Sequence, residues 1–284
     1  MGPHGPAFKG GRMTVGFRHM ELGVMDTPVL VFGGPYSNAQ ALAALIRAAQ
    51  AQGIASAQMI CTGDVVAYCG APARTVAQMR ALGCAVVAGN CEIQLGNGAP
   101  DCGCGFDDGS ACDLLTVGWY GFASGILSQA DKVWMAGLPA VLSFRHYGAR
   151  YAVIHGGMTD VARFIWPSSD LGVFAQEWAA VEQVVGSVDH IIAGHAGVPF
   201  VKLTPQGRWI NAGVIGMPPH DGQQETRFAV LEQGEIRIER LRYDVQGAAD
   251  DMVQAGLPQG YCDGLISGYW PSEDVLPAGL RVPS

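Results

Sequence analysis

Charged side chains are scarce in this sequence, and basic residues are scarcer than acidic ones. Asp, Glu, Lys and Arg make up 15% of the 284 residues, while apolar residues make up 49%. A typical globular chain is roughly 25% charged, so this composition predicts a well-packed core and excludes extensive disorder. Only 17 residues are Lys or Arg against 25 Asp or Glu, for a net charge of -8. Because nucleic-acid binding requires a basic surface, we expect no nucleic acid as a partner.

Long hydrophobic runs are also missing. No uninterrupted apolar stretch reaches the ~18 residues of a membrane-spanning helix, so we expect no membrane association. Residues 1–25 lack the apolar core of a signal peptide and show no apolar periodicity. We expect them to form a disordered N-terminal extension of a cytoplasmic protein whose eight cysteines are reduced. Residues 26–284 then form a single domain, because no linker or repeat divides them.

Short apolar runs and helical patterns alternate along the first part of this domain. The runs VLVF, MICTG and AVVAG have strand character, and the segments between them carry apolar residues at helical spacing. Successive βαβ units of this kind imply a parallel sheet. A Cys-rich insert at residues 91–113 interrupts the pattern, and two helical stretches follow. The rest is predicted to contain a strand–helix–strand unit over 151–194, four antiparallel strands over 200–244 and a C-terminal extension over 245–284.

Four polar residues follow apolar strands, at the carboxyl ends where an α/β sheet collects its ligands. Asp64 follows the run ending in CTG, and Asn90 follows AVVAG. His155 and His195 follow YAVI and HIIAG in the same way. One carboxylate, one amide and two imidazoles suit a borderline divalent ion such as manganese, iron or zinc. Taken singly, each residue is more typical of a helix cap or a turn, so the prediction depends on all four meeting.

The order of these motifs resembles that of the calcineurin-like metallophosphoesterases, in particular their compact bacterial phosphodiesterase and phosphatase group. The resemblance spans residues 29–244 and is carried by GD, GN, a lone His and GH in the right order, with LP and INAGVIGMP in support. It implies an α/β fold, specifically the family's four-layer α/β/β/α sandwich. It also implies that four residues bind metal: Asp64, Asn90, His155 and His195.

Three positions depart from the family's pattern, and all three belong to one of the two metal ions that the family binds. Gly34 stands in place of the aspartate, and Tyr36 in place of the histidine, of the D-x-H motif. Gly197 replaces the second histidine of the G-H-x-H motif. The other ion keeps its ligands, with Asp64 as the family's bridging carboxylate. The resemblance therefore implies one retained site holding one divalent ion.

Cys91 and Tyr36 are the catalytic candidates. In the family a histidine that helps protonate the leaving oxygen follows the Asn motif, and Cys91 occupies that position here. A thiol can donate a proton, although without the positive charge of an imidazolium. Tyr36 either donates its phenol to a phosphate oxygen or simply fills the space of the missing ligand. His220 and Asp221 either reach the site or lie exposed, depending on how their loop folds back.

Three cysteines, Cys102, Cys104 and Cys112, lie close together in the Gly-rich insert. Thiolates at this density can bind zinc or another soft ion and stabilise a loop that has few apolar residues to bury. A disulfide or redox role and unpaired loop thiols are the alternatives. A second metal at these three residues is therefore a prediction for the structure to test.

The sequence as a whole predicts a metal-dependent hydrolase of phosphate esters that acts on a small phosphorylated or anionic substrate. The alternative is a non-hydrolytic relative that keeps the metal pocket to bind an anionic ligand. The two hypotheses agree on metal binding and differ on turnover. Metal content measured together with phosphatase activity therefore separates them.

Overall fold

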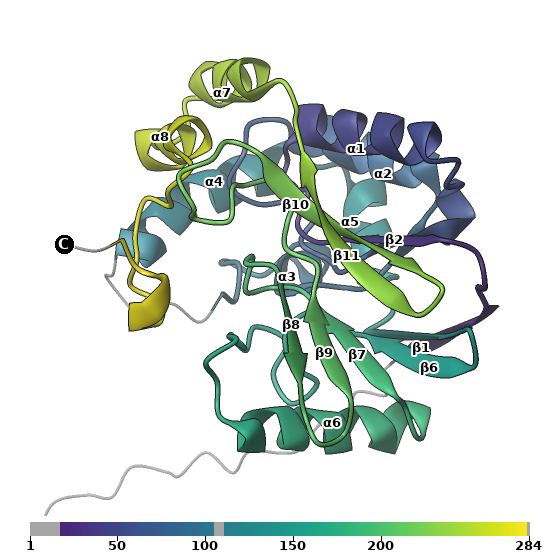
Figure 1. Cartoon of the computed structure of the whole chain (residues 1–284). Helices are drawn as coiled ribbons and strands as arrows, with labels where there is room; N and C mark the ends of the chain where they lie inside the picture. Colours follow the sequence, from purple (N-terminus) through teal and green to yellow (C-terminus); the bar gives the residue numbers. More distant parts are fainter. Residues whose placement is uncertain (1–17, 105–110, 283–284) are drawn as a thin grey trace, which may run out of the picture.

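Residues 18–104 and 111–282 are described by the computed structural model, and they fold around two β-sheets that face each other (Figure 1). Sheet A has the strand order β1-β5-β6-β7-β9-β8. Its strands are β1 (His19–Val24), β5 (Val141–His146), β6 (Ala149–Val153), β7 (His190–Ala193), β9 (Arg208–Asn211) and β8 (Phe200–Leu203). Sheet B has the order β11-β10-β2-β3-β4. Its strands are β11 (Glu235–Leu241), β10 (Thr226–Glu232), β2 (Val29–Phe32), β3 (Met59–Cys61) and β4 (Ala85–Val86).

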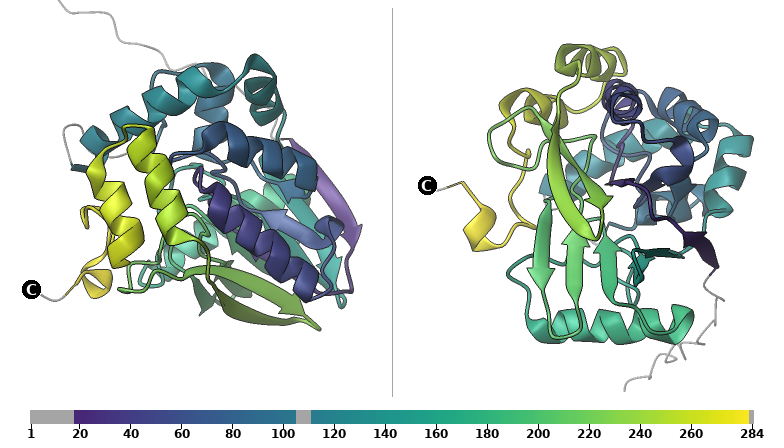
Figure 2. Two further views of the ribbon diagram at one scale, coloured as in Figure 1. Left: turned by 90° about the horizontal axis from the view of Figure 1, so that it is seen from above. Right: turned by 45° about the vertical axis from the view of Figure 1, so that its right-hand side comes forward.

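Helices cover the outer face of each sheet (Figure 2). Sheet A is covered by α6 (Leu171–Val185), which lies along the bottom of the molecule in Figure 1. Sheet B shares a hydrophobic cluster with residues of α1 (Ala39–Ala51), α2 (Pro72–Leu82), α3 (Asn90–Asn97), α4 (Ala111–Ile126), α5 (Gln129–Ala136), α7 (Val245–Gln254) and α8 (Gln259–Ser267). Two short 3₁₀ turns, η1 (Ser56–Gln58) and η2 (Ala278–Leu280), complete the described elements.

The central strands bury both of their faces, which explains their nearly continuous apolar sequences. In β2, Leu30 and Phe32 pack against the helices, while Val29 and Val31 pack between the two sheets. This alternation follows the two-residue period of a strand. The chain thus has helix, sheet, sheet and helix layers with a hydrophobic cluster at each interface. The predicted α/β/β/α sandwich is confirmed.

The N-terminal prediction is wrong for residues 19–24, which form β1 instead of belonging to a disordered extension. This strand pairs in parallel with β5, and Arg150 bonds the Glu21 carboxylate at 3.0 Å. Most β1 residues are exposed because β1 is an edge strand of sheet A. An edge strand of this kind carries almost no apolar signal, which is why periodicity missed it. Residues 1–17 lie outside the described residues.

The Cys-rich insert begins with a helix, which the sequence interpretation missed. Helix α3 occupies the first part of it and ends at Gly98, in a left-handed conformation. The four predicted C-terminal strands do pair as antiparallel hairpins, β8 with β9 and β10 with β11. These hairpins belong to different sheets, and β9 also runs parallel to β7. Over the described residues, the helices are too short or too polar to cross a bilayer.

Candidate metal centre

The four predicted metal ligands come from loops of both sheets that open at one end of the sandwich. Asp64 follows β3 of sheet B, and Asn90 is the first residue of α3, just after β4. His155 and His195 each follow a strand of sheet A, β6 and β7 respectively. Asp64 and His195 have positive φ values of 54° and 60°. Non-glycine residues held in this left-handed region often mark functional sites, because the surrounding structure must offset their strain.

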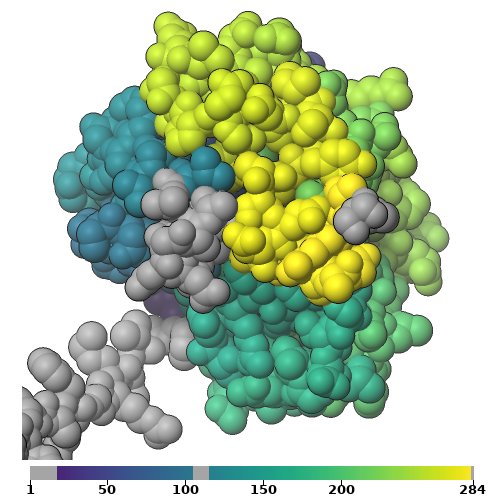
Figure 3. All heavy atoms as spheres, turned by 90° about the vertical axis from the view of Figure 1, so that its left-hand side faces the viewer, coloured from purple at the N-terminus to yellow at the C-terminus, as the bar shows by residue number. Residues whose placement is uncertain are grey.

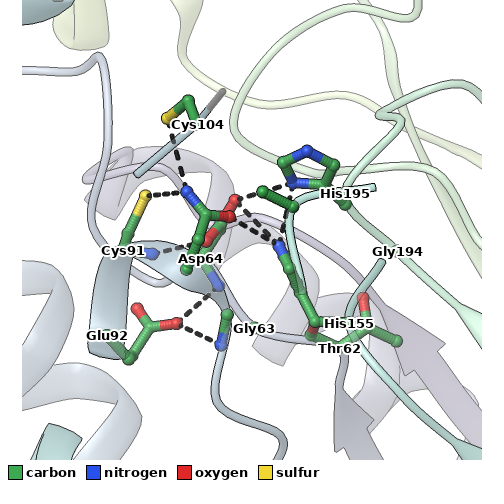
Figure 4. A network of polar contacts seen from close by, with 12 residues as sticks. Thr62, Gly63, Asp64, Cys91, Glu92, Cys104, His155, Gly194 and His195 are labelled. Carbon is green, nitrogen blue, oxygen red and sulfur yellow. Dashed lines mark hydrogen bonds and ion pairs between the residues drawn. The ribbon is translucent and has the colours of Figure 1, made fainter. Parts of the chain in front are cut away.

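The four side chains meet, as predicted from the sequence. Figure 4 labels three of them, Asp64, His155 and His195. The His155 Nε2 atom lies 3.2 Å from Asp64 Oδ2, 3.1 Å from Asn90 Oδ1 and 3.1 Å from His195 Nδ1. Asp64 Oδ2 and His195 Nδ1 are 4.0 Å apart. Each residue is at most 8% exposed. We call these four residues the metal cluster.

The hydrogen bond of His155 to Thr62 determines which of its two nitrogen atoms faces the metal cluster. Its Nδ1 atom lies 2.6 Å from the carbonyl oxygen of Thr62, which can only accept, so Nδ1 carries a hydrogen. In the neutral ring, Nε2 then carries a lone pair. This lone pair faces the oxygen atoms of Asp64 and Asn90 and the imidazole of His195. Electron-rich atoms this close together and away from water repel one another unless a cation lies among them. The donor set therefore fits a divalent metal ion.

Neighbouring groups fix the orientation of these ligands. The Asn90 amide donates to the carbonyl oxygen of Cys102 at 2.9 Å, which turns its Oδ1 toward the cluster. The Glu92 carboxylate accepts the backbone N–H groups of Asp64, Val65 and Gly89 at 2.8–3.0 Å. Glu92 thereby ties the loop after β3 to the loop after β4. Supporting contacts of this kind hold metal ligands in place and tune their basicity.

The pKa values of the cluster follow from burial and mutual contact. Burial alone would raise the pKa of Asp64, but His155 and His195 outweigh it and lower that pKa. Burial opposes protonation of His155, yet the Asp64 carboxylate raises the pKa of this imidazole. Burial and the neighbouring His155 lower the pKa of His195 to about 3. Burial and the charge of Asp64 raise the pKa of Glu92 to about 7. The cluster thus combines a carboxylate anion with a neutral second imidazole, as metal ligation requires.

Aromatic rings fill the space beside the three departures from the family's motifs. A Cβ atom built on Gly34 would lie 2.5 Å from Cε1 of Tyr36, so the phenol ring occupies the direction in which an aspartate would extend. A Cβ atom on Gly197 would lie 3.1 Å from Cζ2 of Trp270. The positions that lack metal ligands are therefore packed against rings.

These rings border a cavity next to His195. Its empty space is about 530 Å³, including the open mouth. Five rings line it together with His195: Tyr36, Tyr68, Phe164, Tyr261 and Trp270. We call it the aromatic cavity. The Nδ1 atom of His195 lies in the metal cluster, and its Nε2 atom is buried.

The two catalytic candidates lie in different surroundings. Tyr36 borders the aromatic cavity, and burial together with the charge of Asp64 raises its pKa well above the usual value, so its hydroxyl stays protonated. Cys91 is 1% exposed, and its backbone N–H donates to Asp64 at 3.3 Å. Burial and the nearby carboxylates raise the pKa of its thiol. His220 instead bonds Glu273 at 2.8 Å, away from the cluster.

The predicted thiolate metal site is wrong for two of its three cysteines. Cys102 and Cys104 form a disulfide with Cα atoms 5.4 Å apart, so their sulfurs are not thiolate ligands. The expectation that all eight cysteines are reduced fails with it, and the alternative of a local disulfide is correct. Asn90 donates to the Cys104 sulfur at 3.3 Å. The side chain of Cys112 lies outside the described residues.

Fold and motif order define the class: the chain has the calcineurin-like metallophosphoesterase fold. It is similar to a metallophosphoesterase from Sphaerobacter thermophilus, with a TM-score of 0.65 and 19% identity over 86% of this chain and the whole of that one. It is also similar to the hypothetical protein PH1004 from Pyrococcus horikoshii, with a TM-score of 0.68, 16% identity and coverage of 86% and 99%.

One curated sequence extends this likeness. The uncharacterized protein MJ0912 of Methanocaldococcus jannaschii is 24% identical over 265 residues, which span 86% of this chain and all of that protein. No protein-family model matches the sequence. The resemblance first carried by short motifs therefore extends over most of the chain.

Two residues that support the candidate site, Glu92 and Trp270, escaped the sequence interpretation. Glu92 had a usable signal, because an acidic residue three positions after a helix N-cap is typical of a capping box, and Gly89 is the N-cap of α3. Trp270 had none. It lies 73 positions from Gly197 along the chain, and only the folded C-terminal segment brings the two together.

Proposed function

We propose that this protein is a metal-dependent hydrolase of phosphate esters that uses one divalent ion, held by Asp64, Asn90, His155 and His195. The observation that carries the proposal is the convergence of buried oxygen and nitrogen atoms on Nε2 of His155, a donor set that fits a divalent cation. Nitrogen and oxygen ligands in this mixture suit manganese, iron or zinc. When bound, such an ion polarises a phosphoryl oxygen and lowers the pKa of water.

The chain's own residues have distinct tasks in this proposal. Asp64 supplies the negative charge that balances the cation, and the hydrogen bond from His155 to Thr62 holds that imidazole in the ligating tautomer. Asn90 contributes a neutral oxygen whose direction is set by its contact with Cys102. Glu92 keeps the two ligand loops of sheet B at a fixed separation.

A single ion is supported by what stands in the other half of the site. The Tyr36 ring lies against Gly34 and the Trp270 ring against Gly197. A second ion would need carboxylate or imidazole ligands there, and apolar rings offer none. The proposed enzyme therefore lacks a second cation to stabilise the departing oxygen, so another group must do this.

Tyr36 is the better placed of the two catalytic candidates for that task. Its ring borders the cavity next to His195, and its raised pKa keeps the hydroxyl a hydrogen-bond donor at neutral pH. A neutral donor aimed at a developing negative charge lowers the barrier. Cys91 is the second candidate, as a proton donor, but it does not border the cavity and is almost fully buried.

The test is hydrolysis by the metal-loaded protein, compared with Asp64→Asn. Purified chain is supplied with manganese, iron or zinc and assayed on phosphate monoesters and diesters. We expect wild type to release phosphate or alcohol and Asp64→Asn to fall to background, because the substitution removes the charged ligand and keeps its volume. Equal rates for the two proteins with every metal and substrate would contradict hydrolysis at this site.

The loss of the family's ligands and catalytic histidine also favours a second candidate function, a non-hydrolytic metal and anion binder. In that case metal and a phosphonate bind with measurable affinity while no ester is turned over. Both bindings would depend on Asp64. The assay therefore separates enzyme from binder with the same pair of proteins.

A further inference from the structure

The aromatic cavity has walls that are already packed against one another. The rings of Tyr36 and Tyr68 meet edge to face with centroids 4.8 Å apart, and Tyr68 lies 4.5 Å from Tyr261. On the other side, Phe164 lies 4.4 Å from the imidazole of His195. Rings held by several neighbours lose little freedom when a ligand enters, so they form a preorganised apolar surface.

Charge is missing from this surface. Among the described residues, none that lines the cavity is Lys, Arg, Asp or Glu, and His195 is its one imidazole. A carboxylate or a second phosphate inside it would lose water without gaining a charged partner, which is costly. The ion proposed at the metal cluster would supply positive charge at the His195 end. The cavity thus has one end for an anion and a body for an uncharged apolar group.

The Trp270 wall of the cavity is held by a set of hydrogen bonds. The Trp270 indole N–H donates to the carbonyl of Pro218 at 2.7 Å, and its backbone N–H donates to Nδ1 of His220 at 2.8 Å. The other nitrogen of His220 bonds Glu273 at 2.8 Å. Figure 3 shows the C-terminal segment, in yellow, lying across this side of the molecule. His220 is therefore a positioning residue that fixes the Trp270 ring beside Gly197.

We propose that the aromatic cavity binds the organic group of the substrate and selects phosphate esters of uncharged aromatic alcohols. This inference rests on the proposed function, since the phosphate must bind at the metal cluster for the ring to enter the cavity. In the reaction, water adds to phosphorus, the bond from phosphorus to the ester oxygen breaks, and the departing aromatic alcohol takes up a proton. The rings that stand beside the missing metal ligands thus form the specificity pocket.

The experiment compares benzyl phosphate with ethyl phosphate on the metal-loaded protein. Both release a primary alcohol, so they differ mainly in the ring. Benzylphosphonate and ethylphosphonate, which are not hydrolysed, measure binding separately by calorimetry. We expect a preference for the benzyl compounds of at least about tenfold in kcat/KM and in affinity, because the ring buries apolar surface. 4-Carboxybenzyl phosphate, which adds a charge, is expected to lose that preference.

Three variants locate the effect. Trp270→Ala is expected to reduce the benzyl preference to less than about threefold, and Trp270→Phe to restore most of it, because an aromatic wall returns. Tyr147→Ala removes an exposed ring in the turn between β5 and β6 and is expected to retain the full preference.

The outcomes separate this inference from the proposed function. If both esters are hydrolysed equally well, or if Trp270→Ala keeps the preference, the aromatic selectivity is wrong and hydrolysis stands. If benzylphosphonate binds preferentially and neither ester is hydrolysed, the pocket stands and the enzyme proposal is wrong. If no phosphonate binds and neither ester is hydrolysed, both are overturned. An equal preference for the charged benzyl ester would refute selection against charge.

Discussion

The site has two halves of opposite chemistry: a polar half around His155 and a ring-filled half around Tyr36 and Trp270. In the polar half, Oδ2 of Asp64, Oδ1 of Asn90 and Nδ1 of His195 lie 3.1–3.2 Å from Nε2 of His155. In the other half, phenol and indole rings pack where the family's motifs would place further ligands. The first half fits a cation, and the second has no charged side chain among the described residues that line it. This difference is the basis for our proposal of one ion and an adjoining organic pocket.

The largest expected effect is on the stability of the protein, through the packing of the ring-filled half. We expect Gly34→Ala to lower the free energy of unfolding by about 3 kcal/mol, because the new Cβ meets the Tyr36 ring and the residue has positive φ. Gly53→Ala is the matched control: it also has positive φ, but nothing lies within 4 Å, so about 1 kcal/mol is expected. Urea denaturation measures both.

A double-mutant cycle sharpens this result. In a Tyr36→Ala background the cost of Gly34→Ala is expected to fall to that of the control, since the ring is gone. If the cost stays the same in both backgrounds, the Tyr36 ring does not occupy the space beside residue 34.

Catalysis tests whether the ring-filled half also takes part in the reaction. We expect Tyr36→Phe to lower kcat by about 100-fold, the typical effect of removing one donor to a developing charge, with unchanged metal content. The ring remains, so packing is preserved. Cys91→Ser, assayed in parallel, is expected to have the smaller effect because that thiol does not border the cavity. A larger loss of kcat in Cys91→Ser than in Tyr36→Phe would contradict this assignment and favour Cys91 as the catalytic residue.

The polar half also depends on Glu92, which contacts the metal-ligand residue Asp64 only through its backbone N–H. Glu92→Gln is expected to weaken metal affinity by about tenfold, because the new amide cannot accept all three backbone N–H groups as well as a carboxylate does. Calorimetric titration with zinc or manganese checks this. Glu182→Gln on α6, where the carboxylate accepts one N–H at 3.3 Å, should leave the affinity as it is.

The smallest expected effect comes from the disulfide. Reducing Cys102 and Cys104, or replacing both with Ser, is expected to weaken metal binding by about threefold, since Asn90 keeps its bond to the Cys102 carbonyl and loses only a weak contact to sulfur. Cys262→Ser is the control. A loss beyond tenfold would mean that the disulfide, rather than the carbonyl, orients Asn90.

The polar half could be predicted from sequence and the ring-filled half could not. Asp64, Asn90, His155 and His195 each follow an apolar strand, so local pattern places each of them at the carboxyl end of a strand. The two pairs lie on different sheets, and the resemblance to the family's two-sheet fold was needed to predict that they meet. The packing of Trp270 on Gly197 depends on a C-terminal segment folding back over the site, for which no local pattern exists. Strand β1 was missed for a similar reason, because its exposed edge position left no hydrophobic alternation.

The cysteines show a further limit of spacing arguments. Density in a Gly-rich loop favoured metal, but thiols that are two positions apart can also bond to each other, and Cys102 and Cys104 do. Glu92 was within reach of sequence reasoning, since its position in α3 is that of a capping carboxylate. Its additional contacts to the loop after β3 required the fold.

The number of metal ions per chain tests the central comparison most directly. Protein loaded with manganese, iron or zinc, freed of unbound ion and analysed by mass spectrometry of the elements, is expected to hold one ion per chain. The His155→Ala variant is expected to hold almost none. Two ions per chain in the wild type would contradict the account, because the ring-filled half would then bind the metal for which the structure provides no ligand.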